Sequence, residues 1–151
     1  MRSLEVRRHA ARDPEEDRLS PEGRAQAEDV GRTLAGGYSA VFTSPARRAA
    51  ETVAWLLRGR GLPLPSHDVV PGLVGESDGD RTPSRLAAVL RELLSRVPEG
   101  GRGLAVGHTP LIEKAVLGLT DREIEPLGEC EGVLLTQDDS GTIEVEQIRL
   151  G

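Results

Sequence analysis

The sequence predicts an α/β fold, a three-layer sandwich in which helices flank a mostly parallel central sheet of about five to six strands. Two observations support this prediction. Short strand-like runs alternate with segments of helical periodicity between Leu4 and Leu119. Each of the four helical segments follows a Ser-Pro or Thr-Pro pair, in which the hydroxyl residue suits the N-cap and proline suits the first helical turn.

The strand-like runs are short, and each precedes a helix that we expect to cover the sheet. These runs lie at residues 4–7, 40–43, 67–70 and 104–106. Apolar residues recur at helical spacing after the four hydroxyl–proline pairs, which begin at Ser20, Ser44, Thr82 and Thr109. We expect Ser20 and Ser44 to be N-caps and Gly59 to end the second helix. The tail, residues 132–150, predicts a C-terminal β-hairpin that turns at 138–141.

The length and composition limit the kind of protein. At 151 residues the chain is expected to form a single domain, residues 1–151, that buries roughly 68–70% of its unfolded surface. The net charge of −6 argues against a nucleic-acid partner, because such proteins carry a basic surface. The single cysteine, Cys130, suits a reducing compartment, and neither an apolar leader nor a membrane-length apolar run is present. We therefore expect a cytoplasmic protein with no membrane partner.

Basic and titratable residues stand where three of the expected strands end. Arg8 and His9 follow the first strand, Arg47 and Arg48 lie in the helix after the second, and His108 ends the fourth. Ligands of open α/β sheets bind outside the carboxyl ends of the strands. Helix N-termini attract anions through their free N–H groups and the helix dipole. The sequence therefore predicts a site that contains two imidazole rings and binds a dianion.

Four motifs of this chain resemble those of a known family. The segments VRRHA, LSPEGRAQA, VFTSPARRAAET and LAVGHTPLI look like the successive motifs of the histidine phosphatase superfamily, also called phosphoglycerate-mutase-like, and they occur in the same order. The first motif of the family is usually Arg-His-Gly, whereas this chain has Ala10 in place of the glycine. That variant and the short length resemble the compact, SixA-like branch of phosphohistidine phosphatases.

The resemblance implies a role for each residue that matches a motif. His9 would be the nucleophile, and Arg8 and Arg48 would bind the phosphate. His108 would be the second histidine in contact with the phosphate, acting in its protonated form, and Thr109 would join it in phosphate binding. The family works through a phosphohistidine intermediate without a metal or another cofactor. The substrate would be a phosphohistidine protein or a small phosphomonoester. A neutral imidazole is a competent nucleophile near pH 7, which agrees with this mechanism.

The proton donor for the leaving group is less defined by the sequence. Family members that have a general acid carry it on a loop after the third strand, and Glu76 is the nearest candidate there, with Asp78 and Asp80 in the same loop. The alternative is that this loop is only a solvated acidic segment. A phosphoramidate needs a dedicated acid less, because its leaving nitrogen can be protonated beforehand.

The residues fit metal-dependent and cysteine-dependent phosphatases less well. The three histidines lack metal-ligand spacing, and Thr136 stands where a cysteine phosphatase built on Cys130 would need an arginine. We expect His67 to be structural and Arg7, by strand alternation, to point away from the site. One non-enzymatic alternative stays open, namely a catalytically weak phosphatase-fold protein that acts as a regulatory or phospho-ligand-binding module.

Overall fold

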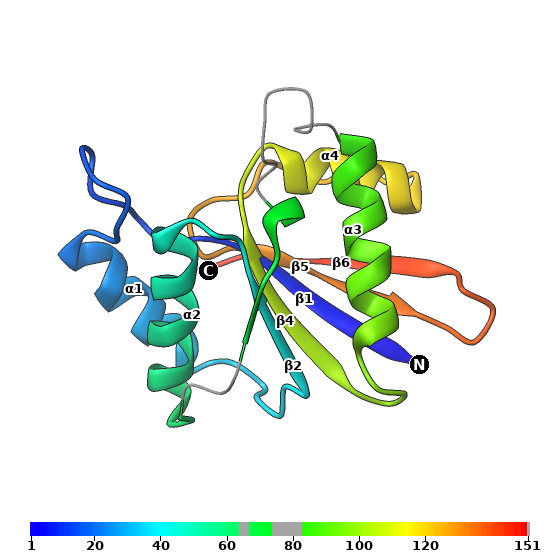
Figure 1. Cartoon of the computed structure of the whole chain (residues 1–151), viewed down its shortest axis with the longest axis horizontal. Helices are drawn as coiled ribbons and strands as arrows, with labels where there is room; N and C mark the ends of the chain where they lie inside the picture. The colour runs from blue at the N-terminus through cyan, green and yellow to red at the C-terminus, as the bar shows by residue number, and fades with distance from the viewer. Residues whose placement is uncertain (64–66, 74–82, 151) are drawn as a thin grey trace.

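A mixed six-stranded sheet forms the centre of the computed structural model, which describes residues 1–63, 67–73 and 83–150 (Figure 1). The strand order is β3-β2-β4-β1-β5-β6, with β1–β4, β4–β2 and β2–β3 parallel and β1–β5 and β5–β6 antiparallel. The strands are β1 (Arg2–Arg8), β2 (Ala40–Thr43), β3 (Asp68–Val69), β4 (Arg102–Gly107), β5 (Gly132–Gln137) and β6 (Ile143–Ile148). The expected sheet and C-terminal hairpin are confirmed, although β3 is shorter than predicted.

Helices cover both faces of the sheet, which confirms the three-layer prediction. Figure 1 shows α1 and α2 together on one side, and α3 with α4 on the other. The helices are α1 (Pro21–Gly31), α2 (Arg47–Arg60), α3 (Pro83–Arg96) and α4 (Leu111–Thr120), with a short 3₁₀ helix η1 (Pro71–Leu73) before α3. None of the helices in the described ranges is long and apolar enough to cross a membrane.

Strand alternation divides the interior into two cores. Leu4 and Val6 of β1 pack with α3 and α4. Val41 of β2 and Val106 of β4 pack with α1 and α2. In the buried middle of the sheet, Arg7 donates from Nε to Glu5 Oε2 at 2.5 Å and does not line the pocket described below. Arg7 therefore points away from the predicted site, as expected.

Only one of the two predicted serine caps is present. Ser20 accepts a hydrogen bond from the Gly23 N–H at 3.0 Å and caps α1 as predicted. The cap prediction for Ser44 is wrong, because α2 begins at Arg47 and Ala46 holds the N-cap position without a side-chain bond. Thr109 is likewise not a cap, since Pro110 stands at the N-cap position of α4. The proline pairs thus locate the helix starts without supplying every cap.

Two glycines allow the backbone to approach closely. Gly59 does not end α2 as expected, because the helix runs to Arg60 and Gly61 is its C-cap. A Cβ at Gly59 would lie 2.0 Å from the Glu28 carbonyl oxygen, so the absence of a side chain lets α1 and α2 touch. At Gly132 a Cβ would lie 2.2 Å from the Val6 carbonyl oxygen. Glycine is required at this second position because β5 begins against the end of β1, next to the site.

Candidate active site

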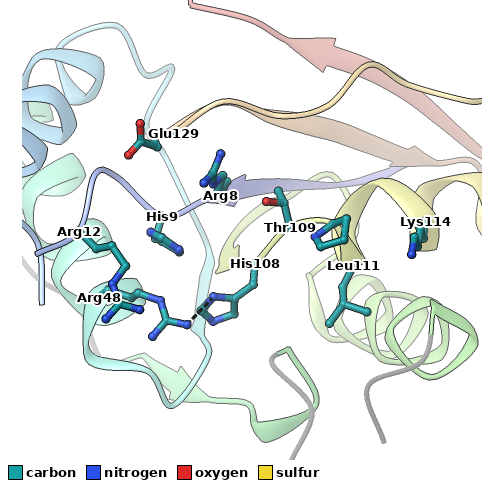
Figure 2. A pocket seen from close by; sticks show the side chains of 10 residues that line it. Arg8, His9, Arg12, Arg48, His108, Thr109, Leu111, Lys114 and Glu129 are labelled. Carbon is teal, nitrogen blue, oxygen red and sulfur yellow. Dashed lines mark hydrogen bonds between the residues drawn. The ribbon is translucent and has the colours of Figure 1, made fainter. Parts of the chain in front are cut away.

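A pocket of about 510 Å³ lies at the carboxyl ends of β1 and β4. Figure 2 shows its lining, which consists of Arg8, His9, Arg12, Arg48, His108, Thr109, Pro110, Leu111, Lys114 and Glu129. Five residues predicted from the sequence are therefore brought together, from the end of β1, the first turn of α2 and the end of β4. The strand-end rule located this group because adjacent parallel strands deliver their carboxyl ends to the same edge.

His9 is buried, and its hydrogen bond defines which ring nitrogen carries the proton. Its Nδ1 lies 2.7 Å from the carbonyl oxygen of Ala10. A carbonyl only accepts, so Nδ1 must donate and the neutral ring keeps its lone pair on Nε2. Burial lowers the pKa of His9, and the positive charges of Arg48 and Arg8 lower it further, while the bond to Ala10 opposes them. His9 is therefore a neutral imidazole near pH 7.

His108 faces His9, with the two ring centroids 5.4 Å apart. Its Nε2 lies 2.8 Å from Ser44 Oγ, and its Nδ1 lies 3.3 Å from Arg48 Nη2, the contact dashed in Figure 2. A guanidinium group only donates, so Nδ1 accepts and Nε2 donates to Ser44. In this arrangement the ring proton is therefore on Nε2. The hydroxyl predicted as a cap instead orients this ring.

Each of the two predicted arginines has part of its guanidinium fork engaged and part available. Arg8 donates from Nη1 to the Leu127 carbonyl at 2.9 Å, and Arg48 donates from Nη1 to Asp17 Oδ1 at 2.8 Å. The Nε of each is buried and has no hydrogen-bond partner within the described residues. A buried donor without a partner is costly, and both side chains line the pocket, where their guanidinium groups can donate to a bound anion. The neighbouring Arg47 instead pairs with Glu51 at 3.1 Å on the surface.

The N-terminus of α2 is already occupied by a side chain that the sequence analysis did not single out. Asp17 accepts from the Arg47 N–H at 2.9 Å and from the Arg48 N–H at 3.2 Å. Partial burial acts to raise the pKa of Asp17, but these bonds and the bond from Arg48 Nη1 outweigh it and lower the pKa. The expectation that this helix N-terminus is open to a bound anion is therefore wrong, because Asp17 fills it.

Other site residues were missed or cannot be placed. Arg12, Lys114 and Glu129 line the pocket but stand in segments without a motif, so no local signal marks them. His67 precedes β3 and does not contribute to the lining. The candidate acids of the loop after β3, namely Glu76, Asp78 and Asp80, lie outside the described residues. Within those residues no three His, Cys, Asp or Glu side chains gather into a potential metal site.

Known proteins resemble this chain in sequence motif and in fold. Residues 4–70 match the model of the histidine phosphatase superfamily (branch 1). The protein histidine phosphatase SixA, solved with tungstate, is 25% identical, with a TM-score of 0.75 over 97% of this chain and 96% of SixA. A phosphoserine phosphatase from Entamoeba histolytica, solved with 3-phosphoglyceric acid, has 17% identity and a TM-score of 0.79 over 99% of this chain and 98% of that chain. A phosphoglycerate mutase from Bacillus anthracis has 16% identity and a TM-score of 0.80 over 97% and 92%.

These matches agree with the geometry of the pocket. The match of residues 4–70 to the family model and the structural match to SixA both support the histidine phosphatase superfamily. The chain is similar to SixA along nearly its whole length, as Ala10 in the first motif and the short chain indicated. Among curated proteins, no sequence relative matches this chain.

Proposed function

We propose that this protein is a phosphatase that works without a metal and forms a phosphohistidine intermediate on His9. The observation that carries the proposal is the state of the His9 ring. Nδ1 is committed to the Ala10 carbonyl at 2.7 Å, so the lone pair of the neutral ring is on Nε2. Arg8 and Arg48 belong to the same pocket lining, and their guanidinium groups supply donors for a phosphoryl group.

The reaction is a double displacement at phosphorus. His9 Nε2 forms a bond to phosphorus while the bond from phosphorus to the leaving oxygen or nitrogen breaks, and the leaving atom keeps the electron pair. The positive charge that develops on the ring is stabilised by the Ala10 carbonyl, which holds the Nδ1 proton. Water then attacks phosphorus, the electron pair returns to Nε2, and inorganic phosphate is released. Arg8 and Arg48 stabilise the phosphoryl oxygens in both steps.

His108 and Thr109 complete the phosphate site in this proposal. The imidazole of His108 is neutral while its Nδ1 accepts from Arg48. A phosphate dianion would compete for that guanidinium N–H, which frees Nδ1 to take up a proton and donate to the phosphate. Ser44 keeps the opposite edge of the ring in place at 2.8 Å throughout. The site thus supplies a third positive group only when the anion is bound.

The substrate is either a phosphohistidine on a protein or a small phosphomonoester. SixA is a protein histidine phosphatase, and the Entamoeba histolytica relative is a phosphoserine phosphatase, so phosphatases of both kinds share this fold. An ester leaving group needs a proton, and Glu76, Asp78 or Asp80 remains our candidate donor. A phosphoramidate would not need one. The whole chain, residues 1–151, acts as one domain in this proposal.

Turnover in EDTA tests the proposal. The purified protein is incubated with phosphohistidine peptides and a panel of phosphate monoesters, and phosphate release is compared with that of His9→Asn. We expect activity without metal, a phosphorylated His9 in acid-free mass spectrometry, and a loss of at least about a thousandfold in the variant. His67→Asn is the matched control, because it changes the same residue type outside the pocket. Activity that survives His9→Asn, or that needs added metal, would overturn the mechanism.

A further inference from the structure

The segment 127–131, between α4 and β5, is held at successive backbone groups. Its Leu127 carbonyl accepts from Arg8 Nη1 at 2.9 Å, and its Leu127 N–H donates to Glu113 Oε2 at 3.2 Å. The Gly128 N–H donates to Glu131 Oε1 at 2.8 Å, and the Glu129 carbonyl accepts from Gln26 Nε2 at 3.4 Å. Chain that bonds at so many consecutive positions is fixed relative to its surroundings.

Both bonds of the Cys130 backbone join it to β1 and its end, which also present the catalytic groups. The Cys130 carbonyl accepts from Arg7 Nη1 at 2.6 Å, and the Cys130 N–H donates to the His9 carbonyl at 3.4 Å. Arg7 is itself fixed by the buried carboxylate of Glu5, which also accepts from Tyr38 at 2.9 Å. The segment 127–131 is therefore held in register with His9 and Arg8.

This segment places the carboxylate of Glu129 in the pocket lining. Glu129 is half-buried and is the sole acidic residue among the lining residues that the structure describes. Among the described residues its carboxylate has no ion pair or hydrogen bond, although Arg8, Arg12 and Arg48 line the same pocket. Asp17 differs from Glu129, because its Oδ1 forms an ion pair with Arg48 Nη1 at 2.8 Å. The charge of Glu129 is thus available to a bound molecule.

The pocket is larger than a phosphoryl group requires, so part of it receives the leaving group. The phosphoryl oxygens belong with the guanidinium groups, and a negative side chain cannot serve them. In Figure 2, Glu129 lies on the side of Arg8 and His9, whereas Lys114 lies on the other side, beyond Leu111. Lys114 is exposed on α4, so solvent screens its charge more than that of the half-buried Glu129. Glu129 therefore dominates the selection of charge in the leaving group.

We propose that Glu129 determines specificity by binding a positively charged nitrogen in the leaving group. This inference rests on the proposed function. The site then prefers phosphoryl donors such as an N-phosphorylated imidazolium or an aminoalkyl phosphate. It discriminates against donors whose leaving group carries a carboxylate, because that carboxylate would meet the like charge of Glu129.

A charge series of small phosphate esters tests the preference. Phosphoethanolamine, propyl phosphate and phosphoglycolate place a positive, a neutral and a negative group at comparable distances from phosphorus, and N-phosphoimidazole adds the aromatic nitrogen. In the native protein we expect kcat/KM to fall in the order positive, neutral, negative. Glu129→Gln should reduce the ratio of phosphoethanolamine to phosphoglycolate about tenfold, the size of one partly screened charge pair, and Glu129→Lys should invert it.

Two controls separate charge recognition from other roles. Glu123→Gln removes the same charge from an exposed position outside the pocket and should leave the ratio unchanged. Propyl phosphate carries no leaving-group charge, so Glu129→Gln should change its kcat/KM less than that of phosphoethanolamine. An equal loss on all substrates in Glu129→Gln, or an unchanged ratio, would overturn the inference.

Binding measurements keep this test independent of turnover. In His9→Asn, calorimetry gives the dissociation constants of phosphoethanolamine and phosphoglycolate without phosphorylation of the protein. The expected preference for phosphoethanolamine should appear there and should vanish when Glu129→Gln is added. A preference that persists in the double variant refutes the role of Glu129. Failure of the proposed function would look different, since the native protein would then release no phosphate and form no phosphorylated His9.

Discussion

Asp17→Ala should destabilise the protein because Asp17 is the acceptor for the first turn of α2. The variant removes the partner of the Arg47 and Arg48 N–H groups, at 2.9 and 3.2 Å, and losing a helix cap costs about 1 kcal/mol. The ion pair with Arg48 adds at most about 1 kcal/mol, since the Asp17 side chain is 45% exposed. The sum, about 1–2 kcal/mol, corresponds to a fall in Tm of about 2–8 °C for a chain of this length.

The same variant should also lower activity, because Arg48 loses the bond that holds its Nη1 at 2.8 Å. We expect kcat/KM to fall about tenfold as the guanidinium group becomes free to turn. Asp17→Asn keeps one oxygen acceptor and should recover part of the stability without recovering the activity. The assays are thermal unfolding and phosphate release, and Glu15→Ala is an exposed control in the same loop.

The stabilisation that Asp17 provides should depend on pH in a definite direction. The pKa of Asp17 is lowered in the folded protein, so its contribution to stability is present above the ordinary carboxyl pKa. That contribution is lost as the pH falls through the lowered value. The difference in Tm between the native protein and Asp17→Ala should therefore shrink in acid. A variant whose Tm and kcat/KM both match those of the native protein at pH 7 would refute the reasoning.

Three other positions offer simpler tests. Burial lowers the pKa of His9 from its ordinary 6.5, so the ring remains neutral and nucleophilic at pH values somewhat below 6.5. The acidic limb of the pH profile of kcat/KM should therefore lie below pH 6.5. A limb above pH 6.5 would contradict the effect of burial on His9. Ser44→Ala removes the partner of His108 Nε2 and should lower kcat/KM about tenfold in steady-state assays, whereas an unchanged value would show that the ring needs no such support. Gly132→Ala forces a Cβ to 2.2 Å from the Val6 carbonyl and should reduce the unfolding free energy in urea by at least about 2 kcal/mol; an unchanged midpoint would mean that β5 shifts at no cost.

The elements of the fold were accessible from local patterns. Apolar spacing and hydroxyl–proline pairs mark the starts of the helices, because both act over one or two helical turns. Ser20 shows where this logic succeeds, since its cap bond to Gly23 spans three residues. Ser44 shows where this local reasoning fails, because Ala46 and not Ser44 is the N-cap of α2. Asp17 stands about thirty residues before α2 and accepts from the Arg47 and Arg48 N–H groups at its start.

The group of candidate catalytic residues was also accessible, for a topological reason. Parallel strands present their carboxyl ends at one edge, so Arg8, His9 and His108 had to meet once β1 and β4 were neighbours. Glu129 could not be found in this way. Its segment has no periodicity, and several of the bonds that place it join residues more than a hundred positions apart, as between Arg7 and Cys130.

The sequence by itself determined the order of strands and helices and the side chains able to carry phosphoryl chemistry. The tertiary structure decided what each of those groups is free to do. The Ala10 carbonyl selects the tautomer of His9, and Asp17 takes the N-terminus of α2 that was expected to bind the anion. Glu129 is left in the pocket with its charge available. The reason is physical: a donor or acceptor is committed by whichever partner folding brings within about 3 Å, and most such partners are distant in the chain.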